Sequence, residues 1–443
     1  MRKNTKRLTS AHTALAALFL ASVTATFAIA QAMEAPSRPV VDSPELAALG
    51  TLAVGVRTIT LVDHNADDVV APRADRRLTI DIWYPAHSVR GAKAVQYAGS
   101  LPAELPGPPV TFSVPGIAIR DARGIPAHYP LVIVSHGRSN ATAALSWLTE
   151  NLASKGYVVA AIRHGDLPRT DAAEGPEFLL RRPLDIAFVT RSLQRSLADE
   201  GLIDPKRTAL IGYSMGGYGV LTDAGAALDP QGAPCKWVPG GLLLPYAAGG
   251  KLQDTIRVSN LRAVVAIAPW GGSVGAWGKT GPAGVTAPLL LIAGDRDHTV
   301  DYPSGALAFF DAATNARRYL LTYHGAGHAL GLGPVPPEMR SRVWDFSWFE
   351  DPVWRKDRII GINLHMITAF LDRYVKGDES RAAYLDGLVP EAIAGSWQAP
   401  PGTAFDARSP GTVGISLWKG FQRDYAEGLE LLSHDAADAA AAP

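Results

Sequence analysis

Between residue 50 and about residue 376 the chain alternates strand-like segments with helix-like segments, and this alternation limits its possible folds more than any other feature. Most of the strand-like segments are continuous apolar runs, as expected of strands buried on both faces: YPLVIVSHG, GYVVAAIRHG, RTALIGYS, LRAVVAIAPW and APLLLIAGDRD. RLTIDIWYP instead alternates like a half-exposed strand, and RPLDIAFVTRSLQRSL has helical spacing with Pro183 in its first turn. The pattern predicts an α/β fold with a mostly parallel sheet of about eight strands and helices on both faces.

The chain has 443 residues, of which 47% are hydrophobic, so it can bury a large core. We expect one α/β domain over residues 50–385, with loop or lid insertions near 88–128, 227–260 and 332–356, where Pro, Gly and Trp interrupt the alternation. Residues 386–443 are predicted to form a C-terminal extension. It would be partly disordered, with a short helix near WKGFQRDYAEGLELL.

The first 32 residues have the features of a cleaved signal peptide: a basic start, an apolar middle and a small-x-small end. An N-terminal membrane anchor is the alternative, because the apolar run approaches spanning length. Cleavage would leave an exported protein, periplasmic or secreted, without a stable membrane anchor. Its single cysteine, Cys235, cannot form an internal disulfide.

The charge balance and the absent motifs narrow the possible partners. Lys and Arg total 42 and Asp and Glu total 42, which gives no electrostatic reason to expect nucleic acid. The sequence contains neither GxGxxG nor GxxxxGK[ST], so we predict no nucleotide cofactor, and no other cofactor is implied.

Two serines lie in GxSxG patterns, Ser214 in GYSMG and Ser273 in GGSVG. Ser214 stands between an apolar strand and a segment that can continue as a helix, which is the setting of a nucleophile elbow. The residues after Ser273, GAWGKTGPAGV, contain Gly and Pro and are unlike a helix. We therefore predict that Ser214 is a nucleophile and that Ser273 is an ordinary loop residue.

A serine nucleophile needs a histidine base, and the histidine needs a carboxylate to hold its tautomer. In the order Ser, acid, His, the acid follows a later strand, and LLLIAGDRDHTV offers Asp295 and Asp297. The histidine follows in YLLTYHGAGHAL, where His324 and His328 compete. These residues alone leave both choices open.

VSHG, GYSMGG, GDRD and GAGH resemble an α/β hydrolase over roughly residues 50–376, and DIWYPA and RPLDIAFV make the chain similar to predicted dienelactone hydrolases and platelet-activating-factor acetylhydrolase-like esterases. The resemblance implies Asp297 as the acid, His328 as the base, and the backbone N–H groups of Arg138 and Met215 as an oxyanion hole. Dienelactone hydrolases proper use a cysteine where this chain has Ser214. Cutinases share a similar elbow but usually carry disulfides.

The predicted activity is hydrolysis of a carboxylic ester, small or lipid-like, through an acyl-enzyme. The same residues allow a peptidase, an amidase or a thioesterase, and a non-catalytic binding protein of the same fold is a further alternative. No metal site is predicted: His324 and His328 are four residues apart, but GAG between them disfavours the helix a zinc pair would need. Tryptophans such as Trp270 and Trp277 could line a pocket or simply pack. The oligomeric state is left open.

Overall fold

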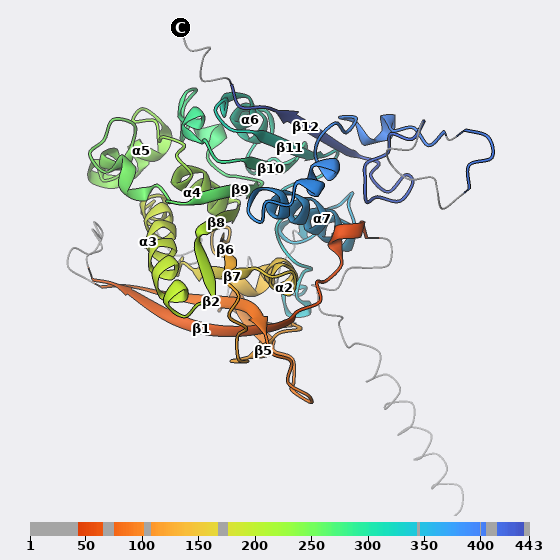
Figure 1. Cartoon of the computed structure of the whole chain (residues 1–443). Helices are drawn as coiled ribbons and strands as arrows, with labels where there is room; N and C mark the ends of the chain where they lie inside the picture. The colour runs from red at the N-terminus through yellow and green to blue at the C-terminus, as the bar shows by residue number, and fades with distance from the viewer. Residues whose placement is uncertain are drawn as a thin grey trace, which may run out of the picture. The chain divides into compact units, whose positions relative to one another are not determined.

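A large central sheet organises the chain and carries the site described below (Figure 1). The computed structural model describes residues 43–64, 75–101, 108–166, 176–342, 346–398, 400–404 and 414–437. All of these lie in one compact unit, Pro36–Pro443. The predicted signal peptide falls outside the described residues.

The sheet has ten strands in the order β12-β11-β10-β9-β8-β6-β7-β2-β1-β5 within the described part of the chain. The central strands β7, β6, β8, β9, β10 and β11 are parallel, and the antiparallel pairs β2·β7, β1·β2 and β11·β12 lie toward the edges. The prediction of a mostly parallel sheet is confirmed, with ten strands instead of about eight. The strands are β1 (Ala53–Asp63), β2 (Arg76–Ala86), β5 (Ile119–Arg120), β6 (Tyr129–Ser135), β7 (Val158–Arg163), β8 (Ile203–Tyr213), β9 (Leu261–Ile267), β10 (Leu289–Gly294), β11 (Arg318–Tyr323) and β12 (Leu429–His434), with a separate hairpin of β3 (Gln96–Leu101) and β4 (Val110–Pro115).

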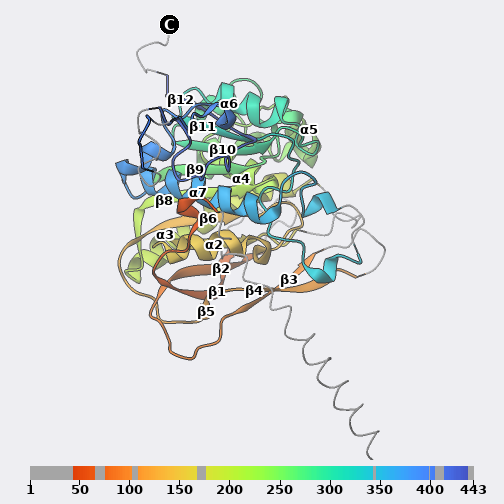
Figure 2. The same ribbon diagram turned by 90° about the vertical axis from the view of Figure 1, so that its right-hand side faces the viewer.

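Helices cover both faces of the sheet, as Figure 2 shows from the side of α2 and α7. Because successive strand residues point to opposite faces, Val132 and Val134 of β6 join the core under α2 and α7, whereas Leu131 and Ile133 join the core under α3, α4 and α6. The helices are α2 (Ser146–Ser154), α3 (Phe178–Asp199), α4 (Met215–Asp223), α5 (Ala233–Trp237), α6 (Ala308–Ala312) and α7 (Lys356–Tyr374).

Helix α3 begins at Phe178, so the prediction that Pro183 lies in its first turn is wrong. A proline inside a helix cannot donate a hydrogen bond to the carbonyl four residues earlier, here that of Leu179. The hydroxyl of Tyr218 on α4 donates to this carbonyl at 3.0 Å. A tertiary contact therefore satisfies the carbonyl that Pro183 leaves without its helical partner.

Strand β2 is buried on both faces over Ile80–Ala86, although its alternating sequence predicted a half-exposed strand. The polar member of the alternation, Asp81, is buried among donors. It accepts hydrogen bonds from Thr58, Thr142 and the guanidinium of Arg163 at 2.7–2.8 Å. The polar residue in this pattern therefore does not mark a solvent-exposed face, because its hydrogen-bond donors come from three other segments of the chain.

The C-terminal extension is part of the sheet. The helix predicted near residues 418–432 is absent from this described stretch, where turns lead into strand β12. Strand β12 pairs antiparallel with β11 from Leu429 to His434. Strand β12 satisfies the N–H and C=O groups at the edge of β11, whereas a short isolated helix is only marginally stable in water. Tertiary context therefore overrides the local helical pattern.

The predicted insertions contain short elements. Residues 88–128 include the β3–β4 hairpin and β5, which pairs with β1 at the edge of the sheet. Residues 227–260 hold α5 and short 3-10 turns, and 332–356 holds the 3-10 turns Pro337–Met339 and Phe346–Trp348. No described helix has both the length and the apolarity needed to cross a membrane.

Candidate active site

Ser214 occupies a strained turn between β8 and α4. Its φ is 53° and its ψ is −115°, a backbone conformation that few residues with a side chain adopt. A Cβ at Gly212 would lie 2.2 Å from the carbonyl oxygen of Gly216, and a Cβ at Gly216 would lie 2.0 Å from that of Ser135. Both glycines of the GxSxG pattern are therefore needed for the turn to close, as a nucleophile elbow requires.

The structure brings Ser214, His328 and Asp297 into one hydrogen-bonded chain. The Oγ of Ser214 is 3.0 Å from Nε2 of His328, and Nδ1 of His328 is 2.7 Å from Oδ2 of Asp297. The side chain of Asp297 is fully buried, while that of His328 is 15% exposed. The second oxygen of Asp297 accepts from the N–H groups of Thr299 and Val300, which hold the carboxylate facing the imidazole.

Asp295 and His324, the other candidates for the acid and the base, pair with each other. Nδ1 of His324 is 3.0 Å from Oδ2 of Asp295, and Oδ1 of Asp295 accepts from the N–H of Gly325 at 2.7 Å. Nε2 of His324 is 3.2 Å from Glu391. Asp295 therefore bonds to His324 and to one backbone N–H, and the geometry separates the two Asp–His pairs.

Among the described residues, His324, Glu391 and Glu430 offer ligand atoms within 4.8 Å of one another and could hold a metal ion. This grouping uses acids from the C-terminal extension, which no local spacing indicated. His328 is not a member, because its imidazole faces Ser214 and Asp297. The spacing of His324 and His328 in the sequence therefore does not translate into a shared site.

The pKa of His324 predicts that this residue makes a pH-dependent contribution to the free energy of unfolding. Burial lowers the pKa of His324, but its hydrogen bonds with Asp295 and Glu391 outweigh burial, so the pKa is raised above 6.5. A raised pKa means that protonation favours the folded state; the contribution is complete below about pH 6.5 and is lost as the pH rises through the folded-state pKa. The melting temperature of the wild type should exceed that of His324→Gln by more at about pH 5 than at about pH 9. Glu391→Gln should reduce the difference, and an advantage larger at the higher pH would contradict this assignment.

The segment after β6, predicted to supply one oxyanion donor, packs directly against the elbow. A Cβ at Gly137 would lie 3.3 Å from Cβ of Ser214. Met215, the other predicted donor, is the first residue of α4, where main-chain N–H groups have no partner within the helix. The structure thus brings Gly137 and Met215 beside Ser214; the donor roles of Arg138 and Met215 stay a prediction.

A buried ion pair fixes this segment. The guanidinium of Arg182 donates to the carbonyl of His136 at 3.1 Å, and Asp166 accepts from the N–H of Ser139 at 3.0 Å. Arg182 and Asp166 are bonded to each other at 2.5 Å. Burial raises the pKa of Asp166, but the charge of the neighbouring Arg182 guanidinium opposes it; the pKa is lowered to about 2, which keeps the pair ionised.

A second Ser–His–Asp arrangement, unforeseen from the sequence, lies beneath the elbow. Ser135 Oγ is 2.9 Å from Nε2 of His164, whose Nδ1 is 2.9 Å from Asp185. All three residues are buried, and burial, with the nearby Arg182, lowers the pKa of His164 well below its usual value. Because the guanidinium of Arg76 also donates hydrogen bonds to both carboxylate oxygens of Asp185, we interpret this buried Ser–His–Asp arrangement as structural.

Ser273 lies in a three-residue 3-10 turn, Gly272–Val274, which ends at Gly275 in a left-handed conformation. Such a turn lacks the helix that follows Ser214. Cys235 is buried, and burial raises the pKa of its thiol to about 11, which disfavours the thiolate needed for nucleophilic attack.

The tryptophans divide between packing and surface. Trp277 is buried, with its indole donating to Thr222. Trp270 is bonded to the nucleophile residue through the backbone, since its main-chain N–H donates to the main-chain carbonyl of Ser214 at 3.0 Å. Its ring centroid is 6.4 Å from that of Trp237, which is 48% exposed and which the sequence did not single out. Trp270 and Trp237 therefore form an aromatic pair that is linked to the elbow through the main chain of Trp270.

Comparisons with known proteins agree with this fold. A family model described as "PET hydrolase-like" matches residues 122–231, which include Ser214. Cutinase 2 of Thermobifida cellulosilytica is 25% identical over 224 residues, covering 50% of this chain and 68% of the relative. Cutinase cut1 of Thermobifida fusca is 25% identical over 224 residues, covering 50% of this chain and only 56% of the relative. The structure of a ferulic acid esterase from Streptomyces cinnamoneus has a TM-score of 0.50 at 19% identity, covering 76% of this chain and 94% of that one.

Together the matches indicate an α/β-hydrolase serine esterase, and they confirm the resemblance stated from the motifs. Within that class it is a carboxylic ester hydrolase. Its similarity to cutinases holds although Cys235, its single cysteine, can form no internal disulfide.

Proposed function

We propose that the chain hydrolyses a carboxylic ester through an acyl-enzyme formed on Ser214, with His328 as the base and Asp297 orienting it. The observation that carries this proposal is the continuous path of hydrogen bonds, 3.0 Å from Ser214 to His328 and 2.7 Å from His328 to Asp297, ending at a serine held on a strained elbow. In the resting state the hydroxyl of Ser214 donates to Nε2 of His328, and Nδ1–H donates to Asp297.

The reaction has two halves. Oγ of Ser214 attacks the ester carbonyl carbon while Nε2 of His328 takes its proton; collapse of the tetrahedral intermediate breaks the carbon–oxygen bond, and His328 protonates the departing alcohol. Water, deprotonated by His328, then attacks the acyl-enzyme, and Ser214 leaves with the proton as the acid product is released. The N–H groups of Arg138 and Met215 would stabilise the oxyanion in both halves by several kcal/mol.

An acyl or alcohol group with apolar or aromatic character suits the surface beside the nucleophile. Trp270, bonded to the main chain of Ser214, and the half-exposed Trp237 supply it. The names of the relatives, cutinases and a ferulic acid esterase, point to esters of long-chain or aromatic acids. We therefore place the substrate among esters of this kind.

The same three residues could cleave an amide or a thioester, so the acyl bond must be tested. Initial rates should be measured on p-nitrophenyl esters of increasing chain length beside the matching p-nitroanilides and thioesters. We expect turnover of the esters with anilides essentially unreacted. Anilide hydrolysis at rates comparable to the esters would favour a peptidase or amidase, and no turnover of any series would favour a binding protein.

A further inference from the structure

Two side chains from one short segment hold the main chain on both sides of His328. Asp351 accepts a hydrogen bond from the N–H of Gly327 at 2.7 Å. The ammonium of Lys356 donates to the carbonyl of Ala329 at 2.5 Å. The residues before and after His328 are therefore each fixed by a charged group, neither of which is in the Ser214–His328–Asp297 chain.

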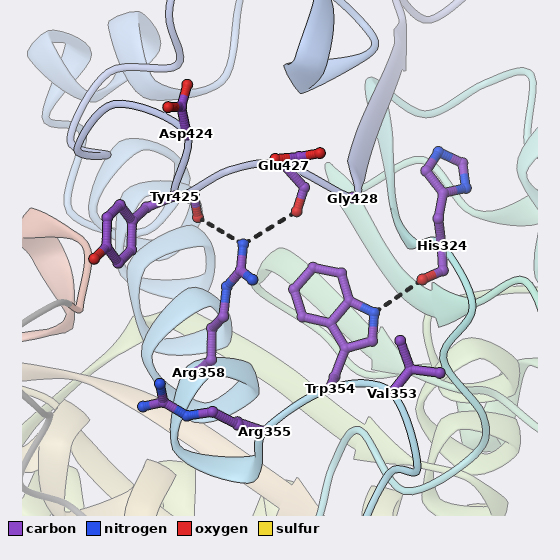
Figure 3. A pocket seen from close by; sticks show the side chains of 9 residues that line it. All are labelled: His324, Val353, Trp354, Arg355, Arg358, Asp424, Tyr425, Glu427 and Gly428. Carbon is purple, nitrogen blue, oxygen red and sulfur yellow. Dashed lines mark hydrogen bonds between the residues drawn. The ribbon is translucent and has the colours of Figure 1, made fainter.

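The segment is itself tightly bound. The second oxygen of Asp351 accepts from the N–H groups of Val353 and Trp354, at 2.9 and 2.7 Å. The indole of Trp354 donates to the carbonyl of His324 at 2.9 Å, as Figure 3 shows. Segment 351–356 thus holds the histidine loop at three points, residues 324, 327 and 329.

The C-terminal extension supports this segment from the other side. The guanidinium of Arg358 lies over the ring of Trp354 at 4.6 Å and donates to the carbonyls of Tyr425 and Glu427 (Figure 3). A Cβ at Gly428 would lie 2.8 Å from the Trp354 ring. A cavity of about 520 Å³ lies among these residues, bounded by Trp354, Arg358 and the 424–428 stretch. The extension therefore packs directly against the residues that hold the histidine loop.

Lys356 is buried, with 7% of its surface exposed. Burial lowers the pKa of its ammonium to about 8, and the carboxylates of Glu350 and Asp351 oppose that effect. A buried ammonium costs free energy that an apolar side chain of similar length would not. Its bond to Ala329 is a specific interaction that such a replacement would lose.

We propose that Asp351 and Lys356 are positioning residues that hold His328 in line with Ser214 and Asp297. The proposal rests on the proposed function, in which His328 is the base. Reacting groups must be aligned closely, and a displacement of about 1 Å can lower turnover ~100-fold. Fixing the main chain on both sides of His328 limits the movement of its imidazole.

The first test is Lys356→Met, which removes the donor but keeps the length of the side chain. We expect kcat to fall ~10- to 100-fold with KM changed by less than about threefold. Thermal stability should not fall in parallel, because the variant also removes a buried charge. The downfield proton resonance of the His328–Asp297 hydrogen bond should shift or broaden. Arg355→Met is the matched control, since the Arg355 side chain is 64% exposed and pairs with Asp357; it should leave these readouts unchanged.

Asp351→Asn is an independent test. The single carbonyl oxygen of the amide can accept either from the N–H of Gly327 or from the N–H groups of Val353 and Trp354. The NH₂ group is a donor, so the hydrogen bonds on that side are lost. We expect the same loss of kcat with KM retained. Asp357→Asn, in the first turn of α7, is the matched control and should leave kcat unchanged.

Wild-type kcat and an unchanged proton resonance in both Lys356→Met and Asp351→Asn would overturn the proposal. Losses matched by Arg355→Met and Asp357→Asn would also overturn it, since they would indicate general destabilisation. If instead Ser214→Ala retained turnover, the proposed function itself would be wrong, so the two failures are distinguishable.

Discussion

Replacing Ser214 by alanine is expected to lower kcat by ~10⁶-fold, the scale seen when a serine-hydrolase nucleophile is removed. The elbow should persist, because its closure depends on Gly212 and Gly216 and not on the hydroxyl. Steady-state ester hydrolysis and circular dichroism check the two halves of this expectation. A serine-directed organophosphonate should label the wild type at Ser214 and leave Ser214→Ala unlabelled.

Ser273→Ala is the matched control, because Ser273 has the same GxSxG pattern but lies in a 3-10 turn. It should retain activity and labelling. Label recovered on Ser273 of the wild-type protein, by peptide mass spectrometry, would reverse the assignment of the nucleophile.

Asp297→Asn is expected to lower turnover by ~10⁴-fold, because an amide facing Nδ1 holds the imidazole in the wrong tautomer, as in serine proteases. Asp297 is the carboxylate that His328 meets, at 2.7 Å, and its other oxygen is already held by Thr299 and Val300. The fold should remain, since asparagine has the same shape. kcat and far-ultraviolet circular dichroism should be measured together.

Asp295→Asn provides the comparison for Asp297→Asn, since the two acids are neighbours on one loop. Asp295 bonds to His324 and Gly325, so its replacement should cost far less turnover. If both variants fold and Asp295→Asn is the more damaging, the acid belongs at Asp295.

Much of the fold could be predicted from the chain, because continuous apolar runs indicate buried parallel strands wherever they occur. The predictions that were wrong share one cause: in each case the residue interacts with a partner that is distant in the sequence. Pro183 lies inside α3 because Tyr218 supplies the lost hydrogen bond, Asp81 is buried because donors from elsewhere surround it, and residues 429–434 form a strand because β11 offers an unpaired edge. No local pattern contains these partners.

By itself the sequence determined the elbow, because apolar strand, Gly212-x-Ser214-x-Gly216 and helix form a local signal whose close approaches only glycine permits. It also limited the acid and the base to two candidates each. The family resemblance pointed to Asp297 and His328, and the tertiary structure pairs these two across 31 residues and Asp295 with His324 across 29. The four residues come from loops after adjacent parallel strands, and which carboxylate meets which imidazole depends on how those loops are held. For His328 that support comes from Asp351 and Lys356, which lie beyond both loops in the chain.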